Sequence, residues 1–168
     1  KWLMGVEGCG YFYVSPECQA DLHRHWAGWL SHENSVSFLF EGAGQLRYDR
    51  PLRQEPQFLE IGSSAALAQV ALEASLNIIL KLGVDQIFAH VQEYLDGLEP
   101  QLAFLGWESL RKSSARSGSF CLRPPAGTDL AGWAGGLDER GVRLSTPDGT
   151  LRLAPHWPNS GEEIPRVV

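Results

Sequence analysis

The chain opens with Lys1-Trp2-Leu3-Met4-Gly5-Val6-Glu7-Gly8-Cys9-Gly10-Tyr11-Phe12-Tyr13-Val14. The glycines of this run predict a turn in which the backbone bends or closely approaches another group. Residues 11–14 are aromatic or β-branched and predict a strand after the turn. The run has no initiator methionine, and it begins with Lys in the middle of a motif. We therefore expect the chain to be the C-terminal part of a longer protein, with Lys1 as a candidate functional residue.

The composition is that of a globular chain with a moderate negative charge. Of the 168 residues, 43% are apolar, which is enough for one real core, and the formal net charge is −6. An acidic balance argues against a nucleic-acid surface. No apolar run reaches the roughly 20 residues that a membrane span needs. We therefore expect neither nucleic acid nor a membrane as a partner.

The cysteines and histidines indicate neither a disulfide framework nor a metal site. Cys9, Cys18 and Cys121 are scattered and form no C-x-x-C pair, which favours a reducing, cytoplasmic location. His23-Arg24-His25 has metal-like spacing, but an H-x-H pair on a helix would point its rings to different faces. We expect no metal site.

The first half of the chain is expected to be mostly irregular. Ser15-Pro16-Glu17 is typical of a helix start, and this helix is expected to run to about Trp29. Residues 30–64 are rich in glycine, proline and charge, and predict a long loop with short strands near 37–40. Loops of this length are usually functional or disordered, and the aromatic residues here favour an ordered, functional one.

Two long helices are expected next. Residues 65–82 are apolar on most faces and predict a buried helix that ends at Gly83. A second helix is expected from Val84, with apolar residues at helical spacing until Glu99-Pro100 closes it.

Short elements follow Pro100 and indicate a small α/β subdomain. The pattern predicts strands near 102–107, 118–122, 142–144 and 150–154, a turn at Pro147-Asp148-Gly149, a helix over about 129–140 capped by Gly141, and a terminal helix from Ser160.

Three separated segments resemble those of one family in order and rough spacing. They are the opening Lys1-Trp2-Leu3 with its glycines, Gln57-Phe58-Leu59-Glu60-Ile61-Gly62-Ser63-Ser64, and Leu151-Arg152-Leu153-Ala154-Pro155-His156-Trp157-Pro158-Asn159-Ser160. They resemble the cofactor-lysine, Glu-x-Gly-Thr-Pro and Arg-x-Ser-x-His-x-x-Asn-Thr segments of the class V aminotransferases. This fold-type I family of pyridoxal-phosphate (PLP) enzymes includes cysteine desulfurases, selenocysteine lyases, kynureninases and isopenicillin N epimerase-like enzymes. Ser64 departs from the family pattern, which commonly has proline there, and Pro158 stands where an aromatic residue is common.

The resemblance implies an α/β fold in three parts. Residues 1–64 would end the large cofactor-binding domain and carry the active-site loop, residues 65–100 would form connecting helices, and residues 101–168 would form the small C-terminal α/β domain. It also implies PLP as the cofactor, a small α-amino acid as the substrate, and a homodimer with shared active sites.

The resemblance assigns Lys1 the central chemical role. Lys1 would form a Schiff base with PLP, and its released amine would then move the α-proton of the substrate. This requires the amine to be neutral part of the time, which burial or a nearby cation achieves. A lone lysine is ordinarily a solvated surface charge, and here the surrounding motif favours the functional interpretation.

Arg152 is the second candidate. A guanidinium matches a planar α-carboxylate with two charge-assisted hydrogen bonds, and the resemblance assigns that role to Arg152. The alternative is a structural arginine that caps the helix start at Glu162-Glu163.

The remaining candidates lie in the first half of the chain. Gly62 and Ser63 would bind the cofactor phosphate of the neighbouring subunit, and Ser63 could equally be a helix N-cap. Trp29 and His32 are candidate substrate-pocket residues, because kynureninases carry a Gly-Trp pair and a histidine in the similar place.

Several reactions remain open within the family. The segment 142–150 holds no cysteine to accept sulfur, which disfavours a standard persulfide-forming desulfurase. We expect an aminotransferase, with a PLP-dependent lyase or epimerase as the alternative. An alternative of another class is a non-catalytic dimerisation or folding module, because the resemblance places the other cofactor-binding residues before Lys1.

Overall fold

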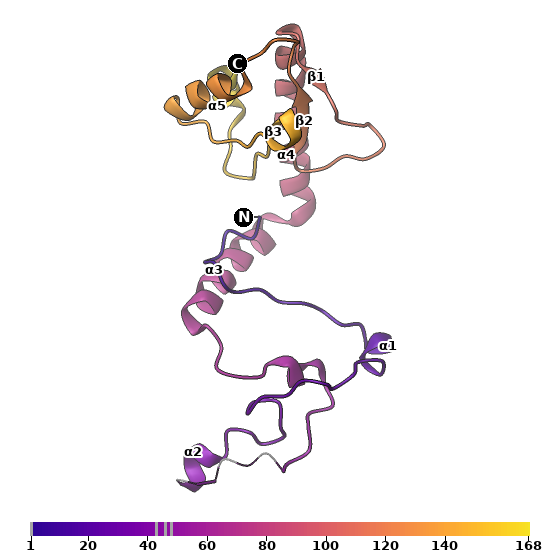
Figure 1. Ribbon diagram of the computed structural model, residues 1–168, viewed down its shortest axis with the longest axis vertical. Coiled ribbons are helices and arrows are strands. Elements are labelled where there is room, and N and C mark those ends of the chain that lie inside the picture. Colours follow the sequence, from indigo (N-terminus) through magenta and orange to yellow (C-terminus); the bar gives the residue numbers. More distant parts are fainter. Residues whose placement is uncertain (1, 43, 46, 48) are drawn as a thin grey trace. The chain divides into compact units, whose positions relative to one another are not determined.

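The computed structural model describes residues 2–42, 44, 45, 47 and 49–168 (Figure 1). These residues form two compact units, the first over residues 3–76 and the second over residues 77–168 together with Trp2. The boundary falls inside a helix, between Leu76 and Asn77. The three-part division expected from the sequence stays a prediction.

The first unit is largely irregular, as expected, and contains three short helical turns. These are α1 (Pro16–Gln19), α2 (Phe38–Glu41) and the 3-10 turn η1 (Pro56–Leu59). Short isolated helices are marginal in water, and α1 ends at Gln19 rather than near Trp29. Beyond it, Arg24 donates hydrogen bonds to the carbonyls of Arg53 and Gln54, at 3.2 and 2.6 Å. Contacts with a distant segment thus replace the expected helix.

Two strand predictions for this unit are wrong. Residues 11–14 form no strand, and the Tyr13 side chain is 79% exposed. A strand needs a neighbour for its backbone hydrogen bonds, and no described segment pairs with these residues. Residues 37–40 contribute to α2 instead of a strand.

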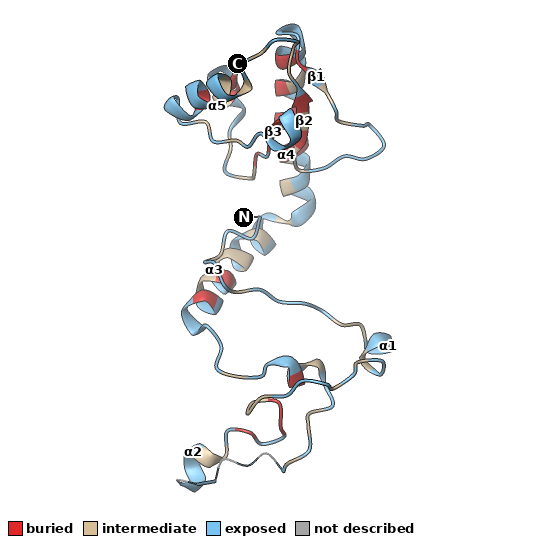
Figure 2. Cartoon of the chain, viewed as in Figure 1, coloured by how far each residue is buried: buried red, intermediate tan, exposed pale blue. Residues whose placement is uncertain are grey.

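Helix α3 (Ala66–Leu82) confirms the first long helix. Its predicted burial is wrong for this chain, because only Ala68 and Leu72 are buried (Figure 2). The large apolar residues that stay exposed on it are Leu67, Val70, Ile78, Leu80 and Leu82. Periodicity predicted the helix correctly, but it does not say which face finds a partner.

Helix α4 (Val84–Phe104) confirms the second long helix but runs past its expected end. It begins after Gly83, whose φ of 86° favours glycine, and continues through Pro100. Proline removes one helical hydrogen bond. Leu98 and Leu102 flank it and are buried at 1% and 0% exposure, so core packing offsets this loss. Among the described residues no single helix is long and apolar enough to cross a membrane, although α3 and α4 pass that test together as a bent pair.

A three-stranded antiparallel sheet packs with α4 in the second unit. Its order is β1 (Glu108–Ser109), β2 (Phe120–Arg123) and β3 (Leu151–Leu153). Phe120 pairs with Leu153, Cys121 with Arg152, and Leu122 with Leu151. Because side chains alternate along a strand, the apolar pairs share one face and join the core, whereas Cys121 and Arg152 share the other.

The remaining elements of the second unit largely match the pattern. The strands expected near 118–122 and 150–154 are confirmed as β2 and β3. Residues 102–107 complete α4 and its turn, and residues 142–144 form no strand, so those two predictions are wrong. The other predicted elements are confirmed as α5 (Leu130–Glu139), followed by Gly141 with a φ of 77°, η2 (Pro147–Gly149), and η3 (Gly161–Glu163) continued by α6 (Ile164–Val167).

Candidate functional site

The predicted site residues are divided between the two units. Lys1 lies outside the described residues, so its role stays a prediction. Trp29, His32, Gly62 and Ser63 belong to the first unit, and Arg152 belongs to the second.

In the first unit, the segments around Gly28 and Gly62 lie side by side. A Cβ atom on Gly28 would lie 1.9 Å from the Ile61 carbonyl oxygen, so only glycine fits there. The Leu30 N–H donates to the same carbonyl at 3.5 Å. Gly28 was not singled out from the sequence, and its place just before Trp29 was the available signal.

Trp29 is brought close to Gly62 by this approach. A Cβ on Gly62 would lie 3.7 Å from the indole Nε1 of Trp29. The Trp29 ring is half-buried and meets the edge of Phe38 with centroids 5.6 Å apart. Two of the predicted site residues, Trp29 and Gly62, therefore lie next to each other in the first unit.

His32 is held in place by the backbone. Its ring is 7% exposed, and Nδ1 lies 2.7 Å from the Arg50 carbonyl oxygen. Because a carbonyl oxygen only accepts, Nδ1 carries the proton in this hydrogen bond. This geometry favours a supporting role for the ring within the unit, and substrate contact by His32 stays a prediction.

The loop that carries Trp29 and His32 is ordered by a second segment. The Arg53 N–H donates to the Ser31 carbonyl at 3.0 Å, and the Glu33 N–H donates to the Pro51 carbonyl at 2.9 Å. The fully buried Ser31 hydroxyl accepts from the Gly28 N–H at 2.9 Å. These bonds fix the backbone on both sides of Trp29.

Gly62 and Ser63 leave three hydrogen-bond donors available. The two N–H groups and the Ser63 hydroxyl have no hydrogen-bond partner in the described part of the chain. The predicted capping alternative is not seen for Ser63, since α3 begins at Ala66 and it is Ser64 that bonds to Gln69, at 3.1 Å. Unpaired backbone donors with a nearby hydroxyl suit an anion such as a phosphate.

In the second unit, Arg152 lies at the centre of β3. Its N–H donates to the Ser145 carbonyl at 2.8 Å, which fixes the backbone. Its side chain is exposed on the face of the sheet turned away from the core. Within the described residues its guanidinium has neither a hydrogen bond nor an ion pair, so the predicted capping of Glu162-Glu163 is not seen. Glu163 accepts a hydrogen bond from Asn159 instead, at 3.0 Å.

His156 lies in the same terminal motif, and the sequence interpretation gave it no role. Its Nε2 lies 2.7 Å from the Trp2 carbonyl oxygen, and its ring lies 4.5 Å from the Trp2 ring between centroids. Its position within the motif was the only signal available in the sequence.

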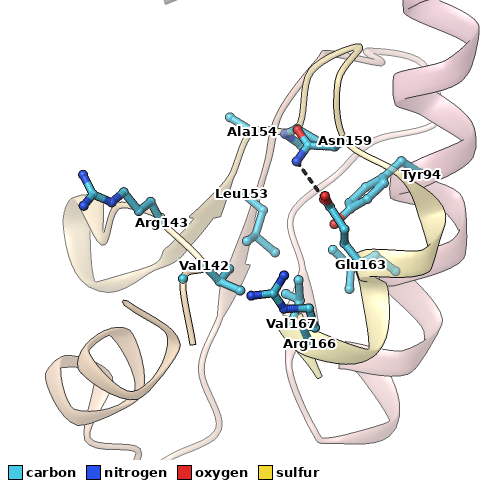
Figure 3. A pocket seen from close by; sticks show the side chains of 12 residues that line it. Tyr94, Val142, Arg143, Leu153, Ala154, Asn159, Glu163, Arg166 and Val167 are labelled. Atoms are coloured by element: carbon cyan, nitrogen blue, oxygen red, sulfur yellow. Dashed lines mark hydrogen bonds between the residues drawn. The ribbon is translucent and has the colours of Figure 1, made fainter. Parts of the chain in front are cut away.

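A pocket of about 220 Å³ lies beside the terminal helix of the second unit (Figure 3). Its lining includes Tyr94, Leu153, Asn159 and Glu163, and the bond from Asn159 to Glu163 crosses it. Burial, together with the nearby Glu163 carboxylate, raises the pKa of the Tyr94 hydroxyl. Arg152 does not line this pocket.

His23 and His25 do not lie on a helix, and their rings do not point to different faces as the sequence predicted. Residues 23–25 are not helical, and the His23 and His25 rings stack with centroids 5.4 Å apart. Among the described residues no cluster of three or more His, Cys, Asp or Glu could hold a metal ion.

No protein-family model matches the chain. Over its full length it is 24% identical, across 169 aligned positions, to YcbU, described as an uncharacterized aminotransferase, of Bacillus subtilis (strain 168). The chain spans 42% of that relative, at its C-terminal end.

Several solved structures have the same fold. The chain matches the cystine C–S lyase C-DES, in complex with its reaction product cysteine persulfide, with a TM-score of 0.81 and 20% identity over 99% of this chain and 42% of that one. A C-DES mutant with glycine covalently linked to its PLP cofactor matches with a TM-score of 0.77 and 19% identity, at the same coverage. The apo cysteine desulfurase of Thermococcus onnurineus NA1 matches with a TM-score of 0.73 and 17% identity over 91% of this chain and 39% of that one. These matches confirm the fold class predicted from the sequence, and the likeness to the aminotransferase YcbU agrees with the predicted resemblance.

Proposed function

We propose that this chain, which has the fold of the C-terminal part of the fold-type I PLP enzymes, belongs to an aminotransferase that acts on a small α-amino acid. The observation that carries the proposal is the match to that fold over 99% of the chain with a TM-score of 0.81. The likeness to an aminotransferase over the full length of the chain favours transamination among the family reactions.

The residues present fit a phosphate-bearing cofactor. Gly62 and Ser63 offer two N–H groups and a hydroxyl, none of them paired within the described residues. Gly62 has no side chain to obstruct the approach of an anion, and the nearest atom to a Cβ there would be Trp29 Nε1. When bound, PLP supplies an electron sink that stabilises negative charge at the substrate Cα.

Arg152 binds and orients the substrate in this proposal. Its guanidinium has no competing partner among the described residues, and its planar fork matches an α-carboxylate with two parallel hydrogen bonds. Fixing the carboxylate also fixes which bond at Cα is aligned for cleavage. Lys1 would provide the amine that holds PLP covalently, and this amine, once displaced by the amino group of the substrate, would carry the proton to and from Cα.

The proposed assembly is a homodimer in which Gly62 and Ser63 contact the cofactor of the neighbouring subunit. Trp29, which lies beside Gly62, would then face the same shared site. The isolated 168-residue chain would hold only part of this site, and we expect it to bind no PLP and stay colourless.

A PLP-dependent lyase is the second candidate. The fold neighbours include a cystine C–S lyase and a cysteine desulfurase, and at their low identity they support only the fold. The connection from residue 142 to residue 150 is short, contains η2 and has no cysteine. A lyase of this kind would thus release its product without a persulfide on that loop.

One experiment separates these reactions. The full-length protein is incubated with PLP and a panel of amino acids, with and without an oxo-acid acceptor, and the products are identified by mass spectrometry. Transamination gives many turnovers to the oxo-acid of the added amino acid only when the acceptor is present, and at most one oxo-acid per PLP without it. Pyruvate or sulfide without an acceptor would show a lyase, and a change of configuration alone would show an epimerase.

Lys1→Ala tests the site within the same protein. After borohydride reduction, the wild-type peptide that contains Lys1 should carry the mass of reduced PLP, and the variant should carry none. Label on another lysine of the wild type would contradict the assignment of Lys1.

A further inference from the structure

The Trp2 ring lies so close to the backbone of Gly118 that only glycine fits at position 118. A Cβ on Gly118 would lie 2.3 and 2.4 Å from two ring carbons of Trp2, far inside contact distance. Gly118 directly precedes the segment that enters β2. A side chain as small as a methyl group at residue 118 would therefore displace the Trp2 ring.

His156 holds the same residue through its carbonyl group. Its Nε2 donates to the Trp2 carbonyl at 2.7 Å, because a carbonyl oxygen only accepts. Its Nδ1 accepts from the Trp157 N–H at 2.8 Å, because a backbone N–H only donates. The two bonds fix the tautomer with the proton on Nε2 and also fix the ring plane against Trp2.

The backbone of His156 is anchored in turn. The Asn159 side-chain oxygen accepts from the His156 N–H at 2.9 Å. The Asn159 carbonyl lies 2.7 Å from Nε2 of His90 on α4, and this nitrogen donates to it. Hydrogen bonds made by His156 and Asn159 thus link the Trp2 carbonyl to helix α4.

We propose that His156 is a positioning residue for Lys1, acting through Trp2. With its ring and its carbonyl both held, the tetrahedral Cα of Trp2 leaves one direction for its backbone nitrogen, the atom to which Lys1 is joined. This inference rests on the proposed function, in which Lys1 holds PLP covalently. A displacement of about 1 Å in a reacting group lowers the rate by up to about 100-fold, so contacts that hold Trp2 in place would affect the rate at Lys1.

Two replacements at His156 separate its hydrogen bonds in the full-length protein. His156→Gln keeps a donor near the place of Nε2, whereas His156→Asn keeps an acceptor near Nδ1 but does not reach Trp2. The measured quantity is the rate at which added PLP attaches covalently to Lys1, followed by borohydride quenching and peptide mass. We expect about a tenfold slower attachment in His156→Asn, from the loss of one hydrogen bond, and a rate nearer wild type in His156→Gln.

Gly118→Ala tests the same anchor from the other side, and Gly135→Ala is the matched control. A Cβ on Gly135 in α5 would meet no atom within 4 Å, so its variant should behave as wild type. Gly118→Ala should slow the attachment as His156→Asn does. In both Gly118→Ala and His156→Asn, amide hydrogen exchange at residues 2–4 should be faster than in wild type. The amount of PLP that each variant retains without a covalent bond should equal that of wild type.

The outcomes separate this inference from the function on which it rests. Wild-type attachment rates in both His156→Asn and Gly118→Ala, with Lys1 labelled in the wild type, would overturn the positioning role alone. Parallel loss of covalent and non-covalent PLP would also overturn it, since that result describes a fold defect. If the wild type carries no label on Lys1, the proposed function fails and the inference fails with it.

Discussion

Arg152 combines a fixed backbone with a side chain that has no partner among the described residues. Its backbone is fixed between β2 and the Ser145 bridge, while its guanidinium has no partner among the described residues. Arg123 on the neighbouring strand is also exposed but is paired with Glu108. The two arginines therefore give a functional candidate and a matched control on one sheet.

Arg152→Ala should raise the KM for the amino acid about 100-fold in the full-length protein, because two charge-assisted hydrogen bonds to the carboxylate are lost. PLP retention should be unchanged, and Arg123→Ala should leave KM near wild type. Arg152→Lys should be intermediate, since an ammonium cannot form the bidentate pair. Steady-state kinetics and cofactor absorbance provide the measurements. Equal loss of substrate and cofactor binding would indicate a structural role for Arg152.

Cys121 offers a reporter of the same site, because it pairs with Arg152 across the antiparallel ladder. Residues directly opposite have Cβ atoms about 5 Å apart on one face. In a protein with Cys9 and Cys18 changed to serine, an amino acid substrate should slow the alkylation of Cys121 several-fold. An amine without a carboxylate should give no protection, and equal protection by both would place the carboxylate elsewhere.

At the scale of elements, α4 is connected to the segment after β1 by Arg111. This side chain is 8% exposed and donates to Gln92 at 2.7 Å, to Glu99 at 3.0 Å and to Asp96. Gln92 is itself buried and donates to the Ser117 carbonyl at 2.8 Å. The sequence predicted the start of α4, but nothing local indicated this cluster, because each of its hydrogen bonds joins residues that lie 12 to 25 positions apart.

Arg111→Ala should lower the free energy of unfolding by about 2 kcal/mol, because the buried Gln92 oxygen and the Glu99 carboxylate lose their donor, while Asp96 keeps only its bonds from Arg116. Arg116→Ala is the control, since its side chain is 45% exposed and its ion pair with Asp96 should contribute less than about 1 kcal/mol. Urea unfolding followed by circular dichroism measures both. Similar effects in the two variants would mean that burial of Arg111 contributes nothing.

The same cluster predicts a dependence of stability on pH. Hydrogen bonds from Arg116 and Arg111 lower the pKa of the Asp96 carboxyl below its ordinary value. A depressed folded-state pKa stabilises the protein above the unfolded value of about 4, and this contribution is lost as the pH falls through the folded pKa. Asp96→Asn should therefore be less stable than wild type at pH 7, and the difference should shrink below about pH 4. Unfolding curves at several pH values measure it, and a constant difference would contradict the assignment.

At the scale of the molecule, the proposed shared site makes a prediction for mixed dimers. Lys1→Ala and Ser63→Glu should each inactivate the full-length protein, the second because a carboxylate repels the cofactor phosphate. In a hybrid of the two variants, one site would carry both changes and the other neither. Refolded mixtures should regain activity from the intact sites, at up to about a quarter of the wild-type value for random pairing of equal amounts. No recovery would mean that Lys1 and Ser63 serve the site of the same subunit.

The sequence by itself determined the long helices α3 and α4, the strands β2 and β3, and the three motifs that carry the resemblance. These features depend on local periodicity, turn chemistry and residue identity, which are complete within a few neighbouring positions. Only the tertiary structure decided that α4 continues through Pro100 and that residues 11–14 form no strand. It also decided three contacts: the Ile61 carbonyl lies against Gly28 next to Trp29, Cys121 lies opposite Arg152, and His156 is hydrogen-bonded to Trp2. Each of these depends on a partner distant in the sequence or on the lack of one, and packing against such partners overrides local preference.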